Sequence, residues 1–249
     1  LQDAFAGAIL ANLSLTVGVW LLLSAVSAVS AKPLSLDPVV WVEGYFQGVV
    51  FACAFNLLLG YAGLLSFGHA AFLATGGYVT GYLLASYPGL TPELGILTGT
   101  AAAVALGALF GVLSIRRQGI YFAMITLALA QMMFFFALQM KFTGGEDGIQ
   151  GVPRGKILCM IDLSNQANMY ITVVAIFLAG FLLIYRIIHS PFGEVLKAIR
   201  ENEARAISLG YKTDRYKLLA FVLSATLAGL AGSTKAIVLQ IASLTDVDW

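Results

Sequence analysis

Side chains that could perform chemistry are scarce in this chain of 249 residues. It contains two histidines, His69 and His189, and two cysteines, Cys53 and Cys159. Two histidines are too few for the common zinc clusters, and no His-Glu-x-x-His pair occurs. The stretch 229–235 has the letters of a phosphate-binding loop in the wrong order. We therefore expect no catalytic residue, no metal site and no cofactor in this chain, so another chain must supply energy for any work.

The composition indicates a membrane protein. Hydrophobic residues make up 59% of the chain and charged residues only 11%, whereas soluble domains carry roughly 25% charged residues. The formal net charge of +1 offers no basic face for nucleic acid. In lipid every backbone polar group must be paired internally, so apolar segments should be helices. The prediction is an all-α, polytopic transmembrane helical bundle that has the lipid bilayer, and no nucleic acid, as a partner.

Intervals without charged residues locate the expected crossings. They lie between Asp3 and Lys32, between Glu43 and Glu93, and over 94–115, 118–140, 163–185 and 218–234. A helix crosses the bilayer in ~20 residues, and the second interval is long enough for two, which predicts about seven crossings. We expect residues 1–249 to form one membrane domain, truncated at the C-terminus. Small residues four apart predict close helix packing: Gly44/Gly48, Gly77/Gly81, Gly95/Gly99 and Gly107/Gly111.

Basic residues predict the orientation. Lys and Arg accumulate in cytoplasmic loops, and here they gather in two connections: Arg116 and Arg117, and then Arg186, Lys197, Arg200, Arg205, Lys212, Arg215 and Lys217. The two crossings between these connections allow both to be cytoplasmic. The loop 141–168 is then external, and the N-terminus is predicted to be cytoplasmic.

The segment 56–72 interrupts the apolar sequence with polar residues and glycines, among them Asn56, Gly60, Gly63 and His69. Irregular backbone at membrane depth is tolerated where it is buried in protein or lines an aqueous cavity. Two interpretations remain open. The segment is either a broken or re-entrant element beside a translocation path, or a cytoplasmic turn between helices with a hydrogen-bonded histidine.

The segment 190–210 has the pattern of one amphipathic helix of about five turns. Ser190 and Pro191 suit its start, and Gly210 suits a left-handed cap at its end. The expected apolar stripe consists of Val195, Leu196, Ile199, Ala206 and Leu209. Acidic residues balance basic ones on the other face, which favours a protein partner over lipid headgroups.

The predicted external loop 143–153 is rich in glycine, with Gly144, Gly145 and Gly148 around Asp147. Such a composition specifies consecutive turns. The spacing of its carboxylates fits no calcium loop, so we expect an ordered cap over the bundle.

Four segments together, 56–72, 117–131, 143–153 and 190–210, resemble the LivM-type permease of branched-chain amino acid ABC importers. The resemblance implies a subunit of the bacterial inner membrane that pairs with a second, related permease. Two ATP-binding subunits, which hold ATP and Mg²⁺, would dock inside, and a periplasmic substrate-binding protein would deliver the amino acid.

The resemblance makes 190–210 the coupling helix that contacts an ATPase. The residues it implies for this contact are Pro191, Glu194, Arg200, Glu201, Glu203, Ala204, Arg205, Ala206 and Gly210. A zwitterionic amino acid would pass along polar but uncharged groups, for which the candidates are Asn56, Gly60, Gly63, His69 and Gln131. The alternative is a stand-alone channel or secondary transporter for a small neutral solute such as urea or an amide.

Overall fold

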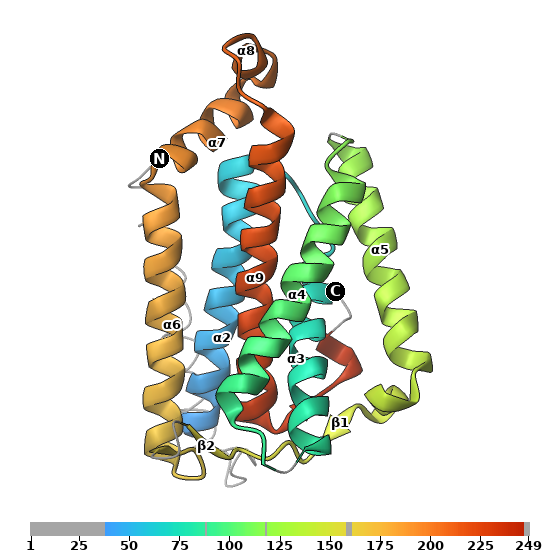
Figure 1. The fold of residues 1–249 in the computed structure, drawn as a ribbon, viewed down its shortest axis with the longest axis vertical. Coiled ribbons are helices and arrows are strands. Elements are labelled where there is room, and N and C mark those ends of the chain that lie inside the picture. Colours follow the sequence, from blue (N-terminus) through green and yellow to red (C-terminus); the bar gives the residue numbers. More distant parts are fainter. Residues whose placement is uncertain (1–37, 88, 118, 158–160, 247–249) are drawn as a thin grey trace, which may run out of the picture. The chain divides into compact units, whose positions relative to one another are not determined.

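The computed structural model describes residues 38–87, 89–117, 119–157 and 161–246 (Figure 1). The chain divides into two compact units, Leu1–Trp41 and Val42–Trp249. The second unit contains nearly all the described residues. The crossing predicted between Asp3 and Lys32 lies outside the described residues.

The described part is mostly α-helical, as predicted. Its α-helices are α2 (Pro38–Asn56), α3 (His69–Ser86), α4 (Pro92–Ser114), α5 (Ile120–Gln139), α6 (Gln166–Ile188), α7 (Pro191–Glu201), α8 (Glu203–Ser208) and α9 (Thr213–Leu239). The helix α2 continues directly into a π-helix, η1 (Leu57–Ala62). Short 3-10 turns are η2 (Lys141–Thr143), η3 (Gly145–Asp147) and η4 (Leu244–Asp246).

Four very short strands form two antiparallel pairs. The strand β1 (Ile149–Gln150) pairs with β4 (Ile241–Ala242), with Ile149 opposite Ala242. The strand β2 (Lys156–Ile157) pairs with β3 (Ile161–Asp162) in the next part of the same loop. The first pair joins the α5–α6 loop to the residues that follow α9.

The number of crossings is smaller than predicted within the described residues. Four helices there are long and apolar enough to span a bilayer: α4, α5, α6 and α9. The interval between Glu43 and Glu93 holds α2 with η1, and then α3, whose histidine, glycines and threonines dilute its apolar content. The prediction of about seven crossings is therefore not confirmed, although a multi-pass membrane protein is.

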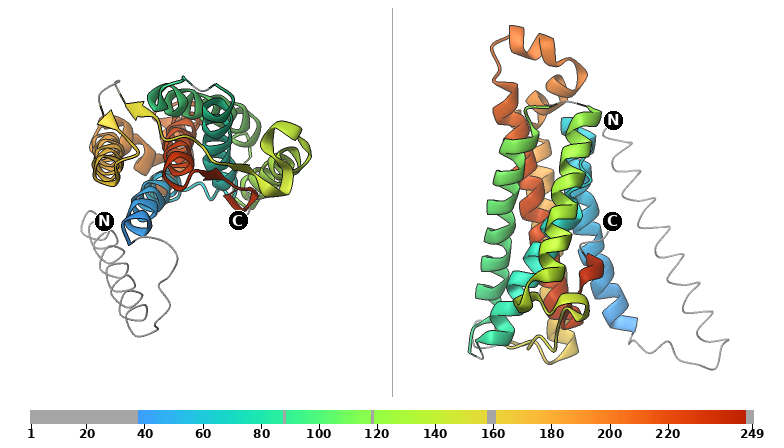
Figure 2. Two further views of the ribbon diagram at one scale, coloured as in Figure 1. Left: turned by 90° about the horizontal axis from the view of Figure 1, so that it is seen from below. Right: turned by 90° about the vertical axis from the view of Figure 1, so that its right-hand side faces the viewer.

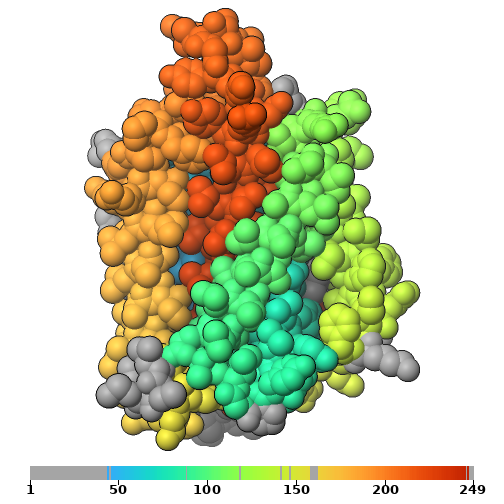
Figure 3. All heavy atoms as spheres, in the orientation of Figure 1, coloured from blue at the N-terminus to red at the C-terminus, as the bar shows by residue number. Residues whose placement is uncertain are grey.

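The helix α9 is the centre of the bundle. Its most apolar window is 67% buried, against 28% for α4 and 22% for both α5 and α6. Both α3 and α4 pack along α9, and Figure 3 shows α9 between α4 and α6 on the face it draws. Small residues allow this approach: a Cβ at Gly76 would overlap the carbonyl of Gly229, and one at Gly107 would overlap Ala225. The predicted pair Gly44/Gly48, in contrast, has nothing within 4 Å.

The connections alternate between two ends of this unit (Figures 1 and 2). One end carries the α4–α5 connection, α7, α8 and the start of the η1–α3 connection, and we call it the α7 end. The η1–α3 connection runs from this end into the bundle, where α3 begins. The opposite end carries the α3–α4 connection, the α5–α6 loop and β4. Connections predicted to share one side of the membrane therefore share one end of the bundle.

Candidate functional site

The segment 190–210 folds as two helices, so the prediction of one helix of five turns is wrong. The helix α7 ends at Glu201, and Asn202 is extended, with φ −156° and ψ 97°. The side-chain oxygen of Asn202 accepts a hydrogen bond from the backbone N–H of Arg205 at 3.0 Å, which caps the start of α8. Asn202 is a residue type that favours helix caps and could have indicated this break. The apolar stripe that continues across it favoured one unbroken helix instead.

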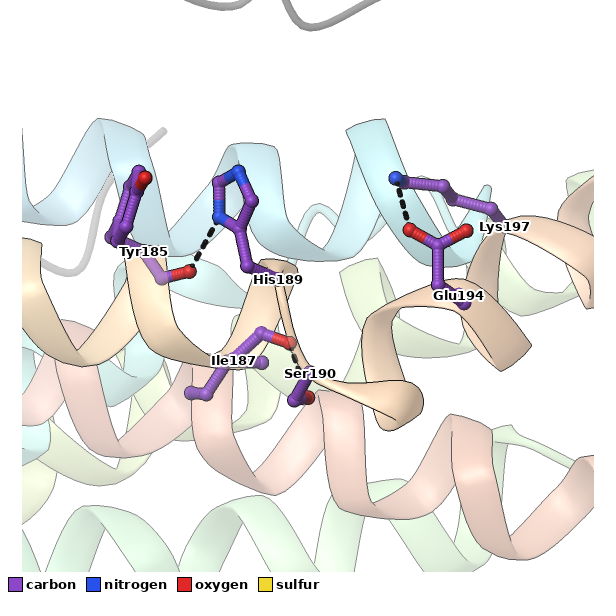
Figure 4. Close-up of polar contacts among 6 residues, drawn as sticks. All are labelled: Tyr185, Ile187, His189, Ser190, Glu194 and Lys197. Atoms are coloured by element: carbon purple, nitrogen blue, oxygen red, sulfur yellow. Dashed lines mark hydrogen bonds and ion pairs between the residues drawn. The ribbon is translucent and has the colours of Figure 1, made fainter.

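Both predicted ends of the segment are confirmed. Pro191 opens α7 directly after Ser190, and Gly210 follows α8 with φ +91°. The Ser190 hydroxyl makes no cap to α7; it donates to the carbonyl oxygen of Ile187 at 2.6 Å (Figure 4). Ser190 therefore fastens the start of α7 to the last turn of α6, which gives a tight corner between the two helices.

The two helices bury one face and expose the other. Leu196, Ile199 and Ala206 are buried, as predicted. Leu209 was predicted on the same stripe but is 69% exposed, because the break at Asn202 turns α8 away from the α7 face. The exposed face carries these predicted coupling residues: Pro191, Glu194, Arg200, Glu201, Ala204, Arg205 and Gly210. Together with exposed Ile207 and Tyr211, it forms a mixed apolar and charged surface at the tip.

The helix α7 also meets the π-helix η1, through side chains that lie outside its buried face. A guanidinium N–H of Arg200 donates to the carbonyl oxygen of Gly60, which belongs to a helix end where carbonyls lack helical partners. The ammonium of Lys197 lies 5.8 Å from the centre of the Tyr61 ring, a cation–π contact. Gly63 ends η1 with φ +69°, and a Cβ there would come within 3.0 Å of Cγ of Arg200.

This junction brings together residues that the sequence assigned to two different roles. Gly60 and Gly63 were candidates for the solute path, and Arg200 was a candidate for ATPase contact. Asn56 lies against Gly60, because a Cβ at Gly60 would overlap the Asn56 side-chain oxygen. We call Asn56, Gly60, Gly63 and Arg200 the α7–η1 junction.

The helix α8 is fastened separately to α9. The ammonium of Lys217 lies 2.5 Å from a carboxylate oxygen of Glu203, and the two side chains are 5% and 22% exposed. Sequence reasoning missed this pair, although a lysine so near the start of an apolar helix was a signal that it needs a partner. The α7–α8 unit thus contacts α6, η1 and α9 through specific polar groups.

His69 lies at the start of α3, buried in the bundle and not at its surface. Its Nε2 is 2.6 Å from the hydroxyl of Ser224 on α9, and that hydroxyl donates to the carbonyl oxygen of Ala54 on α2 at 2.5 Å. A hydroxyl has one hydrogen, so Nε2 must be the donor to Ser224. The rings of Phe55 and Phe72 surround the imidazole. The segment 56–72 thus comprises the end of α2, the π-helix η1, the irregular residues 63–68 and the start of α3, which begins at this buried, hydrogen-bonded histidine.

Gln131 is separated from the other candidates for the solute path. It lies on α5 and lines an open hollow of about 670 Å³, and the described residues in the wall of this hollow are on α5 and the adjoining Met140. None of Asn56, Gly60, Gly63 or His69 lines this hollow.

The loop 143–153 packs against the end of α9. Gly144, Gly145 and Gly148 have φ values of +78°, +62° and +66°, which only glycine adopts readily, while Asp147 is exposed. A Cβ at Gly148 would overlap the carbonyl of Ala242, so this glycine permits the β1–β4 pairing. Val152 is fully buried, with Leu84 and Val238 in one apolar cluster.

Polar contacts reinforce this end of the bundle. Arg154 donates to the carbonyl oxygen of Val238 at 2.9 Å, and Lys235 of α9 forms an ion pair with Asp246 of η4. The backbone N–H of Ser164 donates to Asp162 at 2.9 Å and lowers the pKa of that carboxyl. Within the described residues, no group of three or more His, Cys, Asp or Glu could hold a metal ion.

Comparisons with known proteins identify the family of this chain. The profile of the family "Branched-chain amino acid transport system / permease component" matches residues 48–249. Two relatives are the high-affinity branched-chain amino acid transport system permease proteins LivM of Escherichia coli K12, 29% identical over 209 residues, and of Salmonella typhimurium LT2, 28% identical over 213 residues.

Each of these alignments covers 74% of this chain and 49% of the relative, so the chain spans about half the length of the curated relatives it matches. No solved structure matches the chain significantly. The family match includes η1, the α5 hollow, α7, α8 and α9. On this match, the chain belongs to the family of permease components of branched-chain amino acid transport systems.

Proposed function

We propose that this chain is a transmembrane permease subunit of an ATP-driven importer. It passes branched-chain, or similarly small and hydrophobic, amino acids across the bacterial inner membrane by alternating access. Family membership supports the transport role. The observation that carries the mechanism is the hydrogen bond from Arg200 to Gly60, because it joins the exposed α7–α8 unit to a helix of the bundle.

The proposed assembly contains four further components. A second, related permease completes the membrane part, and two ATP-binding subunits bind ATP and Mg²⁺. A periplasmic substrate-binding protein delivers the amino acid. The exposed tip of α7–α8 suits docking on an ATP-binding subunit, because it combines apolar groups such as Ile207 and Leu209, 56% and 69% exposed, with the charged side chain of Arg205.

The contacts of α7–α8 indicate how force would reach the bundle. A displacement of α7 by the ATPase would act on η1 through Arg200, and a displacement of α8 would act on α9 through the Glu203–Lys217 pair. The corner at Ser190 would transfer the same motion to α6. Since α9 is the central helix, the unit can move several helices together, which alternating access requires.

The distribution of basic residues supports the proposed orientation, with the α7 end and the N-terminus in the cytoplasm. The exposed side chains of Arg116, Arg117 and Arg205 lie at the α7 end, as the positive-inside rule requires of a cytoplasmic face.

The test is a triple variant, Arg200→Ala, Glu203→Ala and Arg205→Ala, in the complete complex in proteoliposomes. It removes the hydrogen bond of α7 to η1 and the ion pair of α8 with α9, so we expect ATP-dependent leucine uptake to be lost while the subunits still co-purify. The control is Arg116→Ala with Arg117→Ala, which removes exposed charges from the α4–α5 connection at the same end. Normal uptake and normal substrate-stimulated ATP hydrolysis in the triple variant would refute the proposal.

The stand-alone channel or secondary transporter makes the opposite prediction. It requires this chain to move a small neutral solute in vesicles that contain no other protein. Such unaided transport, with no dependence on ATP, would replace the proposed function.

A further inference from the structure

The exposed face of α5 contains a hollow that the α7–η1 junction does not use. It is an open space of about 670 Å³, bounded among the described residues by this one helix and the adjoining Met140. The large apolar side chains in its wall include Met132, Phe135 and Phe136, which are 46%, 56% and 50% exposed. The wall also contains two amide side chains, those of Gln131 and Gln139. The helix stands at the edge of the described bundle in both views (Figures 1 and 2).

The amide of Gln131 argues against contact of this face with the hydrocarbon of the bilayer. Gln131 lies ~17 Å along α5 from Ile120, near the middle of a span, and Gln139 lies ~28 Å along it, at the end opposite to α7. Neither amide is bonded to another described residue. An amide that faces hydrocarbon without a hydrogen-bonding partner is strongly disfavoured. The face that carries both amides therefore borders water, a solute or a polar partner surface.

The composition of the hollow matches one class of solute. Methionine and phenylalanine side chains suit a branched aliphatic group. An amide both donates and accepts hydrogen bonds, so it can bind a carboxylate or an ammonium group. The described residues of the wall include no charged side chain, so they would hold a zwitterion without a full ion pair, weakly enough for release, as conduction along a path requires.

We propose that the α5 hollow is a binding station on the translocation path for a small hydrophobic amino acid. Met132, Phe135 and Phe136 contact the aliphatic side chain, and Gln131 and Gln139 hydrogen-bond to the charged ends of the solute. The inference rests on the proposed transport function. It adds Gln139 and the three apolar residues to the path, and it places α5 at the boundary with the second permease.

The first test measures access of water to the hollow. In the complete complex, with Cys53 and Cys159 replaced by alanine, Gln131→Cys and Gln139→Cys are treated with a charged, water-soluble thiol reagent. The matched control is Leu178→Cys on α6, which replaces a side chain 50% exposed and lies ~18 Å along its helix, at a depth similar to that of Gln131. We expect both cysteines on α5 to react several-fold faster than the control, and leucine with its binding protein and ATP to slow their reaction.

The second test measures binding of the solute. Gln131→Met keeps the volume of the side chain but removes its hydrogen bonds to a charged group, so kcat/KM for ATP-dependent leucine uptake should fall about tenfold. Leu178→Met is the control for a conservative change at the same depth. Co-purification of all subunits shows that each variant is assembled.

The outcomes separate this inference from the proposed function. Wild-type uptake that needs ATP supports the function. If the wild type transports leucine but Gln131→Cys reacts no faster than Leu178→Cys, or Gln131→Met transports normally, the hollow faces lipid or protein and only this inference fails. If the wild-type complex does not import amino acids at all, the proposed function and the binding station both fail.

Discussion

The hydroxyl of Ser224 joins three helices of the bundle through hydrogen bonds. Its hydroxyl accepts from His69 on α3 and donates to Ala54 on α2, while Ser224 itself belongs to α9 and is fully buried. The first bond reaches the first residue of α3, and the second reaches a residue within α2, before η1. The serine therefore fixes the start of α3 against the central helix.

We predict that Ser224→Ala destabilises the protein by about 1–3 kcal/mol, because Nε2–H of His69 loses its acceptor in a buried position. Thermal unfolding of the purified complex in detergent measures the effect. The matched control is Ser114→Ala: Ser114 is equally buried, but its hydroxyl donates only to Phe110 within its own helix. An equal loss of stability in the two variants would show that the bridge to His69 contributes nothing.

The sequence showed which single residues were unusual, but it did not show which residues they contact. Asn56, Gly60, Gly63 and His69 stood out because polar groups and glycines are unusual in apolar sequence. Ser224 did not, since serine occurs commonly within membrane helices and its role depends on residues far away in the chain. The contact of Arg200 with Gly60 was equally hidden, because long-range pairing leaves no periodic pattern in one sequence.

At the scale of the elements, the contribution of one ion pair between α8 and α9 can be measured separately. The Glu203–Lys217 pair joins α8 to α9 with side chains 22% and 5% exposed, whereas the Glu194–Lys197 pair lies within α7 with side chains 70% and 36% exposed. Screening by water weakens the second pair much more than the first. The two pairs therefore provide a comparison of an interhelical contact with a local one.

A double-mutant cycle with Glu203→Ala and Lys217→Ala should give a coupling energy of about 1 kcal/mol or more. The same cycle for Glu194 and Lys197 should give only about 0.3–0.5 kcal/mol. The cycle removes the contribution of other contacts that either residue makes, so unfolding of the purified complex is a sufficient measurement. Equal coupling energies in the two cycles would mean that α8 is not held on α9 by this pair.

Local rules predicted the ends of the α7–α8 segment but not its interior. Ser190, Pro191 and Gly210 act through their own backbone preferences, which sequence reports directly. The break at Asn202 depends on whether the chain continues α7 or caps a new helix, and the apolar stripe favoured continuation. Packing against η1 and α9 decides the matter: it buries Ile199 on one helix and Ala206 on the next.

For the whole molecule, charge and hydropathy predicted most of the layout. Four of the six charge-free intervals correspond to α4, α5, α6 and α9, and the α4–α5 connection and the segment 190–210, predicted to share a side, lie at one end. The order in which helices surround α9 was not predictable, since apolar faces in a membrane chain carry little information about their neighbours. The glycine contacts that set this order, such as Gly76 with Gly229, join residues far apart in sequence.

The orientation of the whole bundle is the remaining prediction, and it follows from charge alone. The α7 end carries Arg116 and Arg117 as well as the seven Lys and Arg residues of 186–217, whereas the loop 141–168 contains three, Lys141, Arg154 and Lys156. Because short basic loops stay in the cytoplasm, we expect the α7 end to be cytoplasmic.

Two exposed serines at opposite ends test this orientation: Ser208 in α8 and Ser164 just before α6. In a background without native cysteines, Ser164→Cys should react with an impermeant maleimide in right-side-out vesicles, and Ser208→Cys only in inverted ones. The reverse pattern would place α7 and α8 outside the cell, where no ATP-binding subunit could reach them. The hydrogen bond from Arg200 to Gly60 would then transmit no force from ATP, and coupling would need another element.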